Sequence, residues 1–133
     1  MRWGRQGYSC SQILLLLALE ARGLSNPDLV RAMAGLAYGC GSSKVACGVL
    51  TGGCSLLAFG AVDEQHPDQP SAHLPAMLGD LTDWFDERVG SLHGGITCNA
   101  IVGAAGPAAA RQTCATLLAD TYVKVNEILD GCS

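Results

Sequence analysis

The sequence has few charged residues, few aromatic residues and no cluster of basic residues. Only 15% of its 133 residues are charged, 5% are aromatic, and the formal net charge is −4 at pH 7. Without a basic stripe, the chain offers no electrostatic footprint for nucleic acid or for an anionic membrane surface. Hydrophobic residues make up 49% of the chain, which is enough for a core. We therefore expect one folded domain over residues 1–133 that binds no nucleic acid.

Long apolar runs are also missing. The run "ILLLLALEA" is interrupted by Glu20 and is far shorter than the roughly 20 residues that span a bilayer, so we expect no transmembrane helix. Arg2 and Arg5 before this run are typical of a secretory signal, which stays an alternative. We expect a buried helix here and a cytoplasmic protein.

Several motifs with known chemistry are absent. The chain contains no phosphate-binding loop, no dinucleotide fingerprint, no C-x-x-C and no C-x-x-C-H, so covalent haem is not expected. What the chain does contain is seven cysteines and 17 glycines. An odd cysteine count in a chain of this length favours reduced thiols or metal ligands over a disulfide framework.

Apolar residues recur at helical spacing along most of the chain, which predicts an all-α fold, a single compact bundle of about five helices. Gly23 ends the first helix, and Asn26 and Pro27 are suited to the start of the second. No segment shows the alternation of a β-strand. We expect the helices at about residues 10–22, 27–38, 45–59, 71–92 and 107–129.

The cysteines lie on the inner faces of these predicted helices. Cys10, Cys47 and Cys114 each belong to the apolar stripe of a different helix, and Cys98 lies in a short segment before the last one. Packing of these helices should bring the four thiols together. Cys47 and Cys54 are two helical turns apart, about 10.5 Å, which is too far for a disulfide between them.

Four short segments carry a resemblance to a known family. The segments "GYSCSQ", "CGVLTGG" and "TCNAIVG", followed by Cys114, resemble the C_GCAxxG_C_C family of redox-active proteins. The family's C-G-A-x-x-G motif falls on residues 47–52, where Val49 replaces its alanine. A similar domain occurs in split-Soret-type cytochromes, where four cysteines hold an iron–sulfur centre. The resemblance implies redox chemistry.

From the resemblance we expect an iron–sulfur cluster, with 2Fe-2S favoured, an electron-transfer role and a redox partner protein. Its expected ligands are Cys10, Cys47, Cys98 and Cys114. Gly48 and Gly52 would let a cofactor approach closely, because glycine has no side chain. Cys40 and Cys54 are candidate auxiliary redox residues, and we assign no role to Cys132.

Two other functions stay open. The chain could be a thiol–disulfide oxidoreductase that cycles between dithiol and disulfide, or a structural helical module with buried thiols. Whether it is an enzyme is undecided. We expect the start of a helix at Cys47 to favour its thiolate. The all-round apolar first helix predicts a homodimer.

Overall fold

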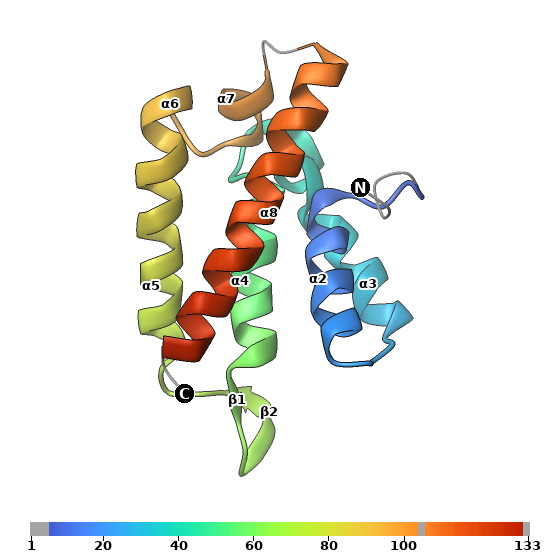
Figure 1. Ribbon diagram of the computed structural model, residues 1–133, viewed down its shortest axis with the longest axis vertical. Coiled ribbons are helices and arrows are strands. Elements are labelled where there is room, and N and C mark those ends of the chain that lie inside the picture. Colours follow the sequence, from blue (N-terminus) through green and yellow to red (C-terminus); the bar gives the residue numbers. More distant parts are fainter. Residues whose placement is uncertain (1–5, 104–105, 132–133) are drawn as a thin grey trace.

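The computed structural model describes residues 6–103 and 106–131, and it is built almost entirely of helices (Figure 1). Arg2, Arg5 and Cys132 lie outside the described residues. The predicted all-α class is confirmed, with more helices than the five expected. The α-helices are α2 (Cys10–Ala21), α3 (Pro27–Met33), α4 (Gly48–Gly60), α5 (Leu74–Phe85), α6 (Ser91–His93), α7 (Cys98–Val102) and α8 (Pro107–Gly131).

The first two helices begin at local capping signals. Ser9 precedes α2, and its backbone N–H donates to Gln12 Oε1 over 3.1 Å. Asn26 caps α3, because its side-chain oxygen accepts from the backbone N–H of Leu29, and Pro27 takes the first helical position. The sequence-based expectation for this second start is confirmed. A short turn η1 (Ala34–Leu36) and a kinked turn η2 (Gly39–Ser43) then lead to α4.

Helix α4 is the central element, and it packs against α2, α5 and α8 (Figure 1). Two adjacent glycines allow this close packing. A Cβ atom at Gly52 would lie 3.0 Å from Leu14 Cδ1 on α2, and one at Gly53 would lie 3.1 Å from Leu81 Cδ2 on α5. The glycine pair therefore lets helices approach α4 from two sides.

The segment between α4 and α5 differs from the expectation. It contains a small antiparallel hairpin of β1 (Val62–Asp63) and β2 (His66–Pro70), so the prediction that no strand forms was wrong here. All residues of β2 are exposed, which removes the apolar alternation that would have marked a strand. Asp63 shapes the turn by accepting the backbone N–H of Gln65 over 3.0 Å.

The predicted helix at 71–92 is divided into three parts. Helix α5 continues through the wide turn η3 (Asp86–Gly90) into α6 and ends at Gly94, which has a left-handed φ of 76°. In the part of the chain that the structure describes, no helix is both long and apolar enough to cross a membrane.

Candidate functional site

One cavity brings together cysteines from four separate elements. It has a volume of about 580 Å³ and is lined by Cys10 at the start of α2, Cys47 before α4, Cys98 in α7 and Cys114 in α8. Most of its lining residues come from the starts of α2 and α4, from α7 and from the first half of α8, and these segments lie toward the same end of the molecule (Figure 1). The six cysteines of the described residues are all free thiols.

Backbone hydrogen bonds fix Cys47 and Cys98 relative to each other. The N–H of Cys47 donates to the carbonyl of Ile96 over 2.8 Å, and the N–H of Cys98 donates to that of Val45 over 3.3 Å. Thr97 then caps α7 by accepting the N–H of Ala100 over 3.0 Å. Two cysteines 51 positions apart in sequence are thus joined through a short strand-like pairing.

Gly48 leaves the space in which Cys10 sits. A Cβ atom at position 48 would lie 3.0 Å from Cys10 Sγ and 2.7 Å from the carbonyl oxygen of Leu36. Both distances are shorter than normal contacts, so any side chain here would displace the thiol or the backbone beside it. Of the two glycines expected beside a cofactor, Gly48 lines the cavity, whereas Gly52 faces α2 and is not part of the lining.

The segment that joins η1 to α4 passes beside the cavity in an unusual conformation. Four consecutive residues, 38–41, have left-handed backbones, with φ of 57° at Tyr38, 61° at Gly39, 55° at Cys40 and 79° at Gly41. We call these four residues the strap. A left-handed conformation costs a non-glycine residue about 1–2 kcal/mol, so tertiary contacts must hold the strap in place.

Burial raises the pKa of three of the cavity thiols. It raises the pKa of the Cys47 thiol to about 11, and it also raises the pKa of Cys10 and Cys114. The nearby thiols add to this effect, because neighbouring thiolates would repel one another. Backbone N–H groups of Tyr38 and Ser11 oppose it by hydrogen bonding to Cys10.

The expectation that the helix start favours a thiolate at Cys47 was wrong. Cys47 does occupy the cap position of α4, and the backbone N–H groups of Val49 and Leu50 lower its pKa. However, its side chain is only 4% exposed, and the loss of water around a buried thiolate outweighs these two hydrogen bonds.

The two candidate auxiliary cysteines lie outside the cavity lining. Cys40 is exposed on the strap. Cys54 is half-buried two turns further along α4, and burial alone raises its pKa. The spacing argument placed Cys47 and Cys54 on one face of α4, but only Cys47 reaches the site.

Sequence reasoning missed four polar residues that line the cavity: Tyr8, Ser9, Tyr38 and Arg111. Tyr8 is two residues before Cys10 and Arg111 is one helical turn before Cys114, so proximity in sequence to the cysteines could have found them. Tyr38 reaches the cavity only through the strap, which carries no sequence signal of its own.

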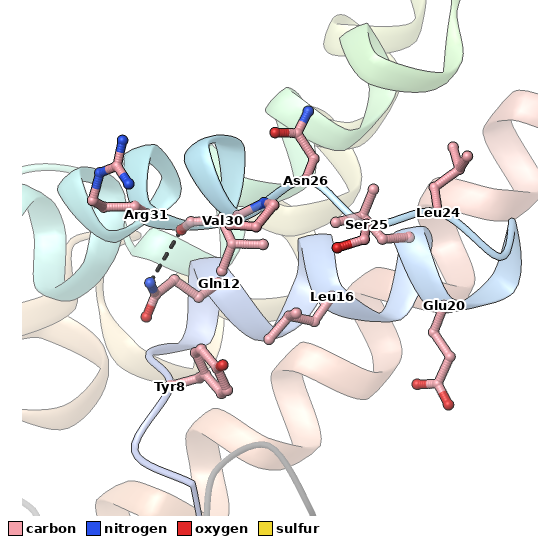
Figure 2. A pocket seen from close by; sticks show the side chains of 11 residues that line it. Tyr8, Gln12, Leu16, Glu20, Leu24, Ser25, Asn26, Val30 and Arg31 are labelled. Atoms are coloured by element: carbon pink, nitrogen blue, oxygen red, sulfur yellow. Dashed lines mark hydrogen bonds between the residues drawn. The ribbon is translucent and has the colours of Figure 1, made fainter.

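A second cavity of about 590 Å³ lies along α2 and α3 and contains no thiol (Figure 2). The side-chain amide of Gln12 closes one part of it by donating to the carbonyl of Val30 over 3.1 Å. Tyr8 lines both cavities. Because its lining offers no redox or metal-binding group other than Glu20, we place the candidate site at the four cysteines.

No compact group of metal ligands is found at the four thiols or elsewhere among the residues that the structure describes. Among the described residues, no three or more Cys, His, Asp or Glu side chains are close enough together to hold one metal ion. The thiols nevertheless surround a common space.

Residues 8–128 match the family described as "Putative redox-active protein (C_GCAxxG_C_C)". The chain belongs to this family. The match includes all four cavity cysteines and confirms the resemblance noted in the sequence. No curated protein and no solved structure matches the chain. Family membership therefore gives redox activity as the general function, and the four-cysteine cavity is the candidate site for it.

Proposed function

We propose that this protein is an electron-transfer module that holds an iron–sulfur cluster, with 2Fe-2S favoured, through Cys10, Cys47, Cys98 and Cys114. The observation that carries the proposal is the single cavity that these four cysteines line. Four cysteine thiolates are the usual ligand set for such clusters, and a bound cluster supplies one-electron chemistry. Together with the redox description of the family, this donor set supports an electron carrier.

The surroundings of the thiols suit a cluster. The space left by Gly48 would let a cluster approach the backbone closely. The backbone N–H groups that hydrogen bond to Cys10 and Cys47 would stabilise negative charge on the ligand sulfurs. Because Cys10, Cys47 and Cys114 have raised pKa values, metal loading at neutral pH should release protons.

The same pKa values count against a thiol–disulfide oxidoreductase at this cavity. The thiolate is the attacking species in thiol–disulfide exchange, and reactive cysteines have lowered pKa values. Cys10, Cys47 and Cys114 all shift in the opposite direction. We therefore rank this function second.

Electrons would pass through the open side of the cavity. Cys10 and Cys114 are only half-buried, and the exposed residues Tyr38 and Arg111 lie at the same opening. A centre so close to the surface could exchange electrons with a docked redox partner protein. We further propose a homodimer, because the first helix is apolar on all sides. We also propose that the protein is cytoplasmic.

Anaerobic purification tests the proposal, with iron and acid-labile sulfide counted per chain. We expect both in the wild-type protein and their loss in Cys47→Ser. The matched control is Cys54→Ser, which changes a cysteine within α4 that lies outside the cavity lining and should keep the metal. A wild-type chain that takes up no iron on reconstitution with iron and sulfide would refute the cluster. Loss of iron in Cys54→Ser but not in Cys47→Ser would refute the ligand set.

A further inference from the structure

We propose that Cys40 is a peroxide-reactive thiol that forms a disulfide with Cys98, one of the four cavity cysteines. This modification site deepens the proposed function, since it would regulate the same cavity, and it rests on that function only for its biological effect. The disulfide itself needs no cluster. Its formation would remove Cys98 from the set of free thiols around the cavity.

The two thiols differ in their access to oxidants. Cys40 is exposed on the strap, whereas Cys98 is 8% exposed and lines the cavity. Exposure makes a cysteine more susceptible to oxidants, and a sulfenic acid beside a second cysteine can condense with it to a disulfide. A hydroperoxide in solution would therefore meet Cys40 first.

The strap packs directly against Cys98. A Cβ atom at Gly39 would lie only 3.2 Å from Cys98 Cβ, and η2 contacts α7. Cys40 is the next residue along the chain. A disulfide needs Cα atoms within roughly 7 Å. Because a Cβ atom one position before Cys40 would already crowd the Cys98 side chain, the strap backbone passes close to Cys98.

The conformation of the strap permits the thiol to turn. Cys40 has a left-handed φ of 55°, which costs a non-glycine residue about 1–2 kcal/mol, so rotation to a negative φ would relieve strain. Gly41, which follows, tolerates either hand. The movement required is a local rotation between η1 and α4, and no α-helix has to unfold.

The chemistry balances with a hydroperoxide as the oxidant. The Cys40 thiolate attacks the O–O bond, an S–O bond forms, and the leaving oxygen takes up a proton to give an alcohol or water. The Cys98 sulfur then attacks the resulting sulfenic acid. An S–S bond forms, the S–O bond breaks, and the hydroxide leaves as water with the proton of Cys98. Two thiols lose two electrons, and the peroxide is reduced.

Peptide mapping of the reduced full-length chain tests this modification. Trypsin cuts after Lys44, Arg88 and Arg111, among other sites, which places Cys40 in peptide 32–44 and Cys98 in peptide 89–111. After one equivalent of hydrogen peroxide and alkylation, we expect these two peptides to be joined in protein that still migrates as a monomer without reductant. In Cys40→Ser the joined species should disappear and Cys98 should stay alkylatable. The control Cys54→Ser should keep it.

Other products would overturn the proposal. They include a bond from Cys40 to peptide 6–22, 45–88 or 112–124, a bond that forms only between two chains, and oxidation of Cys40 to a sulfinic acid without any bond. The count of iron and acid-labile sulfide per chain distinguishes failure of the disulfide proposal from failure of the proposed function. A chain that binds iron but never joins the two peptides refutes the disulfide alone, and a chain that joins them but takes up no iron refutes the cluster alone.

Discussion

At the candidate site, the absence of a side chain at Gly48 leaves the space that the Cys10 thiol occupies. Gly48 lies against Cys10 Sγ and the carbonyl of Leu36 at distances that leave no room for a methyl group. Gly79 in α5 is a matched position, because a Cβ atom there would meet nothing within 4 Å. Two identical substitutions at these glycines should therefore have opposite effects.

Gly48→Ala should lower the free energy of unfolding by about 1–3 kcal/mol, the usual cost of overpacking. Gly79→Ala should raise it by up to about 1 kcal/mol, because alanine is the better helix former. Urea denaturation of both variants measures the difference. Equal effects at the two positions would show that the contact at Gly48 relaxes without cost.

The protonation of Cys47 predicts a dependence of stability on pH. Burial raises its pKa from 9.0 to about 11 in the folded chain, so the folded state binds this proton more tightly than the unfolded state. Below pH 9 both states are protonated and the contribution is complete. As the pH rises from 9 to 11, the unfolded chain loses the proton first, and stability falls by up to about 1.4 kcal/mol per pH unit.

Metal-free wild-type protein and Cys47→Ser should be unfolded in urea at several pH values from 7 to 11. Lysines and tyrosines also titrate in this range, so the difference between the two proteins is the relevant quantity. We expect the wild type to lose up to about 3 kcal/mol more than the variant. Parallel pH profiles would mean that Cys47 is as accessible to water in the folded chain as in the unfolded one.

At the scale of the elements, the apolar faces of α2 predict that the protein self-associates. Its residues Leu14 and Leu15 are fully buried, while Leu16 and Leu17 on the remaining faces are half-buried. We expect a dimer that covers these faces, and light scattering across a wide concentration range should report twice the chain mass. Substitution of Leu16 by Gln should shift the protein toward the monomer. A wild-type monomer at all concentrations would remove the dimer.

Most α-helices could be predicted because their signals are local. The cap at Asn26, the proline at position 27 and the apolar stripe of α8 are all visible in sequence. The structure places α8 close to its expected bounds, whereas α3 begins as expected at Pro27 but ends at Met33, before the expected residue 38. The hairpin could not be predicted, since it is held by backbone pairing and by the turn at Asp63, with exposed side chains throughout β2.

The cysteines of the site were predictable, but its polar lining and its electrostatics were not. The inner-face positions of Cys10, Cys47 and Cys114 followed from helical periodicity, and these residues do line one cavity. The pKa of Cys47 depends on how much water the neighbouring elements exclude, which no local pattern encodes. The strap at Gly39 passes close to the Val45 carbonyl and to Cys98, and this close approach forms only in the folded chain.

For the whole molecule, the four thiols connect the beginning of the chain to its last helix. Cys10 and Cys114 are 104 positions apart, yet they line the same cavity. A group bound by all four cysteines would tie α2, α4, α7 and α8 together at one end of the molecule. The hairpin lies at the opposite end, beyond the far end of α4 (Figure 1).

Hydrogen exchange of metal-free and reconstituted protein should show that binding stabilises the cysteine end of the molecule more than the hairpin end. Helix α7 has only five residues and is held to the segment before α4 by two backbone hydrogen bonds, so it should open readily without metal. Binding stabilises only states in which the ligands are assembled, and we expect amide exchange in α7 to slow at least tenfold on reconstitution. Residues 62–70 of the hairpin serve as the internal control and should change little. Equal slowing at both ends would indicate global stabilisation, and unchanged exchange in α7 would exclude Cys98 as a ligand.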